Sequence, residues 1–417
     1  APAIEGPWSE PIYLNSSGFD PSLFHDDDGH KWLLNMLWDH RPQHNSFGGI
    51  LLQEYDPVKQ TLVGPVENIF PGTALGLVEG PHIYKVDGWY YLLVAEGGTF
   101  LTHAETVARS KNIHGPYEVM PDNPLITSAR NPRLRLQSAG HGSLVRHKDG
   151  SWSFAHLCRR PLPNGRSILG RETALQNIEW KDGWPRLSSG GREPLDNFKA
   201  PELPLHPWPK SPARDDFDSA SLAVDWQAPR VAIDERMASL TARKGYLRLY
   251  GRESIVSRFE QSLVARRQTS FHVEASTCVE FEPENFQQMA GLVAFYSTDS
   301  FYYLYLSHAD HAPKCLGLMR CERGNISFPI EKEYLLDGWT KVFLKLVIQH
   351  DRIRFSYSED GNAWTVAGWE QDASILSDEH AAPCGFTGNF VGMACQDLTG
   401  GRKHADFDWF EYRELGD

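Results

Sequence analysis

The chain has 417 residues, and an apolar fraction of 41% with 12% aromatic residues is enough to bury the cores of two or three domains. It carries 41 Lys and Arg against 54 Asp and Glu, a net charge of −13, without a basic run or stripe. Nucleic acids and anionic membrane surfaces are therefore not expected as partners. No apolar stretch approaches the roughly 18 to 20 residues that a membrane-spanning helix needs.

The cysteines are scattered and form no Cys-x-x-Cys pair, so the sequence indicates neither a zinc site nor a disulfide framework. This pattern favours free thiols in a reducing compartment, and hence a cytoplasmic location. The six cysteines are Cys158, Cys278, Cys315, Cys321, Cys384 and Cys395.

The first residues, Ala1-Pro2-Ala3-Ile4, are neither an initiator methionine nor a signal peptide. They lead at once into Gly6-Pro7-Trp8, which is similar to Gly115-Pro116-Tyr117 further along the chain. We therefore expect the chain to begin inside its first domain.

Three segments share one pattern, in which a polar residue lies eight positions before an Asp-Gly turn. The polar residues are Asp20, Glu79 and His141, spaced by 59 and 62 residues. Each turn lies between two apolar runs, which is typical of a β-hairpin. A repeat of this kind predicts the blades of a β-propeller, in which equivalent positions converge on one axis. Two carboxylates and an imidazole would then meet, as in a hydrolytic site.

Residues 1–205 carry these hairpins and show no helical periodicity, so we expect an all-β domain there. Prolines crowd the stretch from Pro201 to Pro212 and cannot continue a strand ladder, which predicts a linker at 206–213. Residues 214–417 show longer alternating strands, which predict a β-sandwich. Three repeats are fewer than the four to eight blades of a closed propeller. We therefore expect further blades on a segment N-terminal to Ala1.

Glu79 lies in Leu77-Val78-Glu79-Gly80-Pro81, where apolar neighbours would raise the pKa of its carboxyl group and suit it to act as a general acid. Asp20 precedes Pro21, and the shared register would bring it to the same axis. A single carboxylate at a strand end more often caps a backbone amide. The registration of three polar residues favours the catalytic interpretation over that one.

His141 is a candidate to hold water or a hard cation, although one imidazole is a weak metal signal and a hydrogen-bonded core histidine is the commoner case. Arg171 could clamp a carboxylate with its fork of donors, or form a surface ion pair. Trp38 follows an apolar run and could present an indole platform to a sugar ring. Packing between blades is an equally good interpretation for this tryptophan.

Four segments together resemble glycoside hydrolase family 43, most of all its two-domain β-xylosidases. The resemblance implies an all-β fold in which a five-bladed β-propeller, present here only in its C-terminal part, precedes a β-sandwich domain that contributes a loop to the active site. The segments are Phe19-Asp20-Pro21-Ser22-Leu23-Phe24, Val78-Glu79-Gly80-Pro81, Ala139-Gly140-His141-Gly142-Ser143-Leu144 and Gly170-Arg171-Glu172-Thr173.

The resemblance also implies roles for single residues. Glu79 would be the general acid and Asp20 the carboxylate that orients it and tunes its pKa. His141 would lie under the sugar, where some family members hold a calcium ion, here through water; no cofactor is otherwise required. The substrate-binding residues would be Arg171, Trp38, Thr99 and a phenylalanine of the sandwich, Phe390 or Phe386.

The family's general base is an Asp in a segment like Tyr-Pro-Asp-Pro, and no such segment occurs here. We expect the base on the N-terminal propeller segment of the same protein. The predicted activity is exo-acting, inverting release of xylose from the non-reducing end of β-1,4-xylooligosaccharides, with α-L-arabinofuranosidase as a second activity. The alternatives are an arabinan-directed hydrolase and a glycan-binding protein without catalysis. Whether copies of the chain form a homo-oligomer is left open.

Overall fold

The computed structural model describes residues 1–200 and 204–416. The chain divides into two compact units, one comprising Ala1–Arg160 with Glu172–Glu202 and the other Pro161–Arg171 with Leu203–Asp417. Both units are built from strands, which confirms the predicted all-β class. The helical part of the described residues is the single short 3-10 turn η1 (Ala373–Ile375), so none of their helices is long enough to cross a bilayer.

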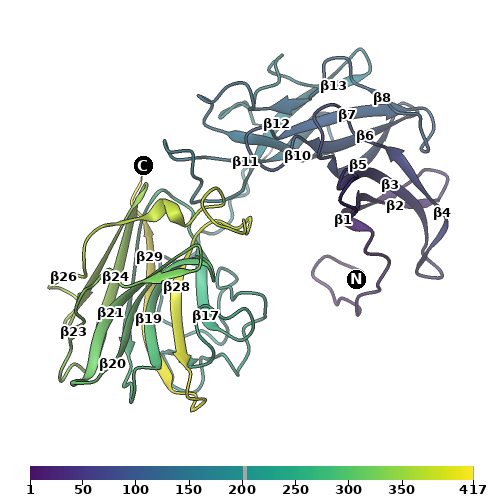
Figure 1. Ribbon diagram of the computed structural model, residues 1–417. Coiled ribbons are helices and arrows are strands. Elements are labelled where there is room, and N and C mark those ends of the chain that lie inside the picture. The colour runs from purple at the N-terminus through teal and green to yellow at the C-terminus, as the bar shows by residue number, and fades with distance from the viewer. Residues whose placement is uncertain (201–203, 417) are drawn as a thin grey trace. The chain divides into compact units, whose positions relative to one another are not determined.

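The first unit consists of three antiparallel sheets that follow one another along the chain (Figure 1). The strands of the first and third sheets are paired in the order of the sequence, as in propeller blades, and in the second sheet the last two strands both pair with the third strand. The first sheet contains β1 (Gly18–His25), β2 (Lys31–Trp38), β3 (Phe47–Asp56) and β4 (Thr61–Phe70). The second contains β5 (Glu79–Val86), β6 (Trp89–Glu96), β7 (Ala104–Ser110), β8 (Glu118–Val119) and β9 (Ile126–Thr127). The third contains β10 (Gln137–Arg146), β11 (Trp152–Arg159), β12 (Glu172–Lys181) and β13 (Trp184–Leu187).

The sheets pack face to face because the middle sheet is apolar on both sides. Side chains alternate along β6, so Leu92 and Val94 join a core with the first sheet. Tyr91 and Leu93 point the other way and join a core with the third sheet. The first strands of the sheets, β1, β5 and β10, contact one another in turn and so form the inner edge of the unit.

Each inner strand contains a bulge with a residue in the left-handed region. The φ angles are 53° at Asp20, 60° at Gly80 and 49° at His141, and the strand register shifts at each of these places. The structural equivalent of Asp20 and His141 is therefore Gly80, and the expected equivalence of Glu79 with them is wrong by one residue.

Turn length explains this shift. The β5–β6 hairpin closes with a two-residue turn between Val86 and Trp89. The β1–β2 hairpin instead leaves five residues between His25 and Lys31, and β10–β11 has a loop of the same length. Counting from the Asp-Gly pair therefore misplaces the bulge of β5 by one position.

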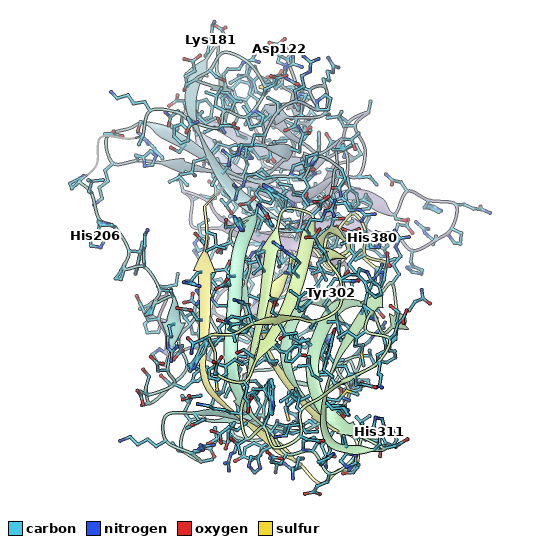
Figure 2. All side chains as sticks on the ribbon, turned by 90° about the vertical axis from the view of Figure 1, so that its left-hand side faces the viewer. Asp122, Lys181, His206, Tyr302, His311 and His380 are labelled. Carbon is cyan, nitrogen blue, oxygen red and sulfur yellow. The ribbon has the colours of Figure 1, made fainter. Side chains whose placement is uncertain are left out.

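The second unit is a sandwich of two antiparallel sheets around one large apolar core. One sheet contains β14 (Arg214–Asp215), β15 (Ala238–Ser239), β16 (Leu247–Tyr250), β18 (His272–Glu280), β24 (Val342–Gln349), β25 (Arg352–Ser358), β26 (Thr365–Val366), β27 (Gln371–Asp372) and β29 (His404–Glu414). The other contains β17 (Ser262–Arg267), β19 (Gln288–Ser297), β20 (Ser300–Ala309), β21 (Ala312–Glu322), β22 (Asn325–Ser327), β23 (Tyr334–Leu335) and β28 (Phe390–Asp397). Tyr302, labelled in Figure 2, is fully buried in this core, and its hydroxyl donates to the carbonyl of Asp372.

The segment Pro161–Arg171 between β11 and β12 belongs to the second unit, although the sequence analysis placed it within residues 1–205. Leu162, Ile168 and Leu169 are buried in the core of the sandwich, and this apolar anchor explains the assignment. Residues 206–213, the predicted linker, form neither helix nor strand, while Pro201 lies outside the described residues.

Candidate active site

Asp20 and His141 meet at the inner edge of the first unit. Oδ2 of Asp20 accepts a hydrogen bond of 3.1 Å from the backbone amide of Gly80, and the same oxygen lies 3.9 Å from Nε2 of His141. Both side chains are about 30% exposed. The chain thus brings a carboxylate, an imidazole and the backbone next to Glu79 together, from three different sheets.

The three bulges fit closely. A β-carbon on Gly80 would lie 2.6 Å from Nε2 of His141, so only glycine allows the imidazole to approach this backbone. Next to it, the hydroxyl of Ser22 donates to the carbonyl of Pro81 at 2.5 Å and ties β1 to β5. Left-handed conformations of non-glycine residues are strained, and such strain is found where function requires an exact geometry.

Glu79 is half-buried at the start of β5. It pairs across the sheet with Ala95, which in turn pairs with Glu105 on β7. Side chains of directly paired residues point to the same face of a sheet, and Glu105 reaches the third sheet, where its Oε2 accepts the amide of Gly142. We infer that Glu79 faces the same side, toward the strand that carries His141.

His82 is a second imidazole at this place, two residues after the bulge of β5. Burial lowers its pKa, the nearby His141 lowers it further, and the charge of Asp20 opposes both effects. His82 is therefore neutral near pH 7. A neutral imidazole can donate or accept one hydrogen bond without adding charge to the site.

Trp38 and Thr99 lie in the same unit. Trp38 is 45% exposed at the end of β2, and its ring centroid lies 6.0 Å from that of Phe19 and 5.7 Å from that of Phe47. Trp38 is therefore an exposed aromatic side chain, and its contact with a sugar stays a prediction. Thr99 is half-buried in the turn after β6, beside Gly98.

Arg171 belongs to the second unit, where its guanidinium lies over the ring of Phe386, 4.3 Å from the ring centroid. Phe386 is 47% exposed, whereas Phe390 at the start of β28 packs against a second apolar cluster of the sandwich that includes Leu263 and Phe295. Of the two phenylalanines proposed from the sequence, Phe386 is therefore the one in contact with Arg171. Its exposed ring and the guanidinium form one surface, which suits a planar or polar ligand.

The loop that carries Arg171 is held in place by the side chain of Arg267 on β17. Arg267 donates from Nη2 to the carbonyls of Leu169 at 2.6 Å and Arg171 at 2.8 Å. Gly170 and Gly388 touch so closely that a β-carbon on Gly170 would lie 2.5 Å from the nitrogen of Gly388. The loop with Arg171 and the loop with Phe386 are therefore locked together.

The sequence analysis missed His82 and Glu105. His82 directly follows the segment Val78-Glu79-Gly80-Pro81. Glu105 lies on β7, whose sequence Ala-Glu-Thr-Val-Ala-Arg-Ser contains four polar residues, and nothing in that pattern predicts that this carboxyl group is fully buried.

A calcium ion prefers six to eight oxygen ligands. The described residues contain no group of three or more His, Cys, Asp or Glu side chains arranged to hold a metal ion. Direct coordination by side chains thus does not fit at His141, and a cation held through water stays a prediction.

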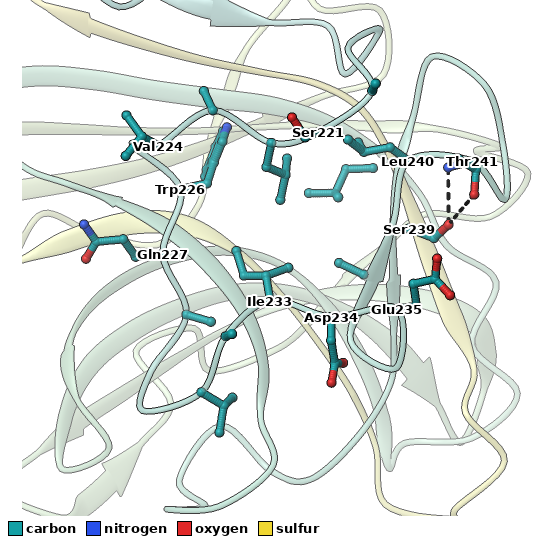
Figure 3. Close-up of a pocket in the computed structure, with 18 residues that line it drawn as sticks. Ser221, Val224, Trp226, Gln227, Ile233, Asp234, Glu235, Ser239, Leu240 and Thr241 are labelled. Carbon is teal, nitrogen blue, oxygen red and sulfur yellow. Dashed lines mark hydrogen bonds between the residues drawn. The ribbon is translucent and has the colours of Figure 1, made fainter. Parts of the chain in front are cut away.

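A cavity of about 730 Å³ opens in the second unit beside Trp226 (Figure 3). Its lining is largely apolar, and its carboxylates are Asp234 and Glu235. Asp234 is engaged by Arg236 in a 2.8 Å ion pair. No histidine and none of the predicted site residues lines this cavity, so it does not offer the acid–base chemistry found at the inner strands.

Comparison with known proteins agrees with this arrangement. The model of glycosyl hydrolases family 43 matches residues 1–185, and that of the β-xylosidase C-terminal concanavalin A-like domain matches residues 214–413. A β-xylosidase of Bacillus subtilis is 45% identical over 99% of this chain and 79% of that protein. A xylan 1,3-β-xylosidase of a Vibrio species is 44% identical, with the same two shares. The crystal structure of a xylan β-1,4-xylosidase from Bacillus halodurans has a TM-score of 0.97 at 51% identity and covers 99% of this chain and 80% of that one.

The fold is that of a propeller-type glycoside hydrolase with a C-terminal sandwich. The chain belongs to glycoside hydrolase family 43, as the resemblance implied.

Proposed function

We propose that this chain acts in the exo-hydrolysis of β-1,4-xylooligosaccharides and releases xylose from their non-reducing ends with inversion at the anomeric carbon. The observation that carries the proposal is the contact between Asp20 and the amide of Gly80, the residue after Glu79, with His141 3.9 Å from the same oxygen. The similarity to enzymes named β-xylosidases supports the substrate class.

In the proposed reaction, Glu79 donates its proton to the glycosidic oxygen as the bond to the anomeric carbon breaks. Asp20 holds a negative charge near Glu79, and a like charge raises the pKa of the acid so that it keeps its proton until it is needed. Water adds to the opposite face of the sugar and loses its proton to a base. Inverting enzymes place the two carboxyl groups roughly 6.5 to 9.5 Å apart to make room for this water.

We propose that the base is supplied by a propeller segment of the same protein that precedes Ala1. The chain covers 79–80% of the length of the Bacillus subtilis and Bacillus halodurans proteins, so those proteins contain residues beyond the part matched here. Arg171, Trp38, Thr99 and Phe386 or Phe390 are proposed to bind the sugar. If His141 holds a calcium ion through water, elemental analysis of the enzyme should detect bound calcium. The variant His141→Ala should then contain less of it.

The variant Glu79→Ala tests the assignment of the acid. We expect it to lower kcat/KM for xylobiose by about 10² to 10⁴, the usual contribution of one proton transfer. An aryl xyloside with an acidic leaving group needs little protonation and should lose much less. Equal losses on both substrates would contradict the role of Glu79.

α-L-Arabinofuranosidase is a second candidate activity of the same site. A protein named xylosidase/arabinosidase from Humicola insolens is 47% identical over the whole chain, and a non-reducing-end α-L-arabinofuranosidase from Bacteroides ovatus is 32% identical. Rates on the para-nitrophenyl derivatives of both pentoses measure the balance between the two activities.

A further inference from the structure

Glu105 is a fully buried carboxyl group at the back of the inner-strand site. Its Oε2 accepts the amide of Gly142 at 3.0 Å, and the amide of His141 also donates to this carboxyl group. The two residues at the bulge of β10 are therefore both anchored on one side chain of β7.

The bulge depends on such an anchor. His141 has a φ of 49°, a strained value for a residue with a side chain. The backbone on both sides is pressed against neighbours: a β-carbon on Gly142 would lie 2.3 Å from Cζ of Phe154, and one on Gly140 would lie 2.8 Å from the carbonyl carbon of Ala104. The bulge cannot shift toward these neighbours, and the carboxyl group of Glu105 holds its two amides in place.

The environment of Glu105 favours the neutral form of its carboxyl group while it accepts the two amides. Burial raises the pKa of Glu105 well above its usual range, and Glu96 raises it further. Oε1 has no hydrogen-bond partner among the residues that the structure describes. The raised pKa favours the neutral form of Glu105, which competes less with Asp20 for a charge on the imidazole of His141.

We propose that Glu105 is a positioning residue of the hydrolytic site: by accepting the amides of His141 and Gly142 it fixes the bulge that aims the imidazole of His141 at Asp20. Its effect on turnover rests on the proposed function, whereas its effect on the orientation of His141 does not. Glu105 touches backbone amides and has no part in the proton transfers.

Three variants of the full-length enzyme separate the acceptor from its charge. Glu105→Gln keeps an oxygen for the two amides, and we expect kcat within about threefold of the wild type. Glu105→Leu removes the acceptor, and we expect kcat on xylobiose to fall by about 10²-fold, the scale of an ångström-sized misplacement, with KM changed much less. Glu105→Asp withdraws the oxygen by one methylene group, and we expect an intermediate loss of kcat. This variant provides the test if Glu105→Leu does not fold.

Gln176 provides the matched control. Gln176 lies on β12 of the first unit and is also buried, with 2% of its surface exposed. Its side-chain amide donates to the carbonyl of Leu195 and accepts the amide of Leu195. Gln176→Leu should cost comparable stability in a thermal melt and leave kcat unchanged. An equal loss of kcat in Gln176→Leu and Glu105→Leu would reduce the effect to general destabilisation and overturn the proposal.

¹⁵N spectra of the histidine rings give a readout that does not depend on turnover. The signal of His141, assigned by its absence in His141→Asn, should move in Glu105→Leu and Glu105→Asp and stay in place in Glu105→Gln. An unchanged signal in the first two variants would overturn the proposal. If the signal moves but the wild-type enzyme cleaves no xyloside, the positioning role stands and the proposed function fails.

Discussion

The carboxylate of Asp20 accepts the amide of Gly80 at 3.1 Å, across the contact between two inner strands. The two residues occupy equivalent bulges, and each has a left-handed backbone. Glu79 is therefore placed next to Asp20 by the backbone, without a direct bond between the two carboxyl groups being required. A charge held in this way can tune a neighbouring acid.

Replacing Asp20 by Asn tests that influence. The amide oxygen of Asn can still accept the hydrogen bond from Gly80, so we expect the fold to remain. The loss of a negative charge should lower the pKa of Glu79, because like charges favour the protonated form of an acid. The alkaline limb of the pH profile of kcat/KM should then move to lower pH. An unchanged limb in Asp20→Asn would show that Asp20 does not tune the acid.

Gly80→Ala tests the close approach of His141. The new β-carbon would lie 2.6 Å from Nε2 of His141, and the φ of 60° is strained for alanine. We expect kcat/KM to fall by about 10²-fold because the imidazole must move. Gly64→Ala is the control, since Gly64 has a φ of 70° and open space around its α-carbon. A similar loss of activity in both variants would contradict the role of the contact.

Gly170→Ala tests the lock between the loops that carry Arg171 and Phe386. A β-carbon there would lie 2.5 Å from the backbone nitrogen of Gly388, which cannot move independently. We expect the free energy of unfolding to fall by about 2 to 4 kcal/mol, the sum of backbone strain and overpacking. Gly165→Ala is the control and introduces backbone strain without overpacking, because the φ of Gly165 is 81° and nothing lies within 4 Å of the added β-carbon. Chemical denaturation of both variants gives the difference; equal losses would refute the lock.

The buried Glu105 predicts a pH dependence of stability. Its pKa is raised in the folded state, so the unfolded chain loses this proton first as the pH rises. The wild type therefore loses up to about 1.4 kcal/mol per pH unit from this group above pH 4.5, until the pH passes the folded pKa. Glu105→Gln lacks this loss, and its stability relative to the wild type should grow from pH 5 to pH 7. A constant difference in urea denaturation over that range would contradict the protonated state of Glu105.

Much of the inner-strand site was predictable because hairpins leave local signals. Alternating apolar runs around Asp-Gly turns located Asp20 and His141, and the neighbourhood of Glu79. The exact register was not predictable, because Asp87 and Gly88 form a two-residue turn while the other hairpins have longer loops. The position of each bulge depends on the number of residues in the turn that follows, and the constant spacing of eight residues to the Asp-Gly pair does not reveal this number.

Two features depend on contacts that are distant in sequence. Glu105 and Gly142 meet only when the second and third sheets stack, and neither residue has a local motif. The segment Pro161–Arg171 interrupts the third sheet between paired strands, and its apolar residues could equally have covered a blade. Its place in the sandwich core follows from the closeness of Gly170 and Gly388, a contact between residues more than two hundred positions apart.

The stereochemistry of the first-formed sugar tests the central claim most directly. ¹H NMR spectra recorded from the moment of mixing the full-length enzyme with an aryl β-xyloside, which releases xylose only from the cleaved bond, should show α-xylose first, and β-xylose only later as the product mutarotates. Inversion of this kind is what a general acid at Glu79 and a water-activating base on the opposite face of the ring produce. β-Xylose as the first product, or no xylose at all, would contradict the account.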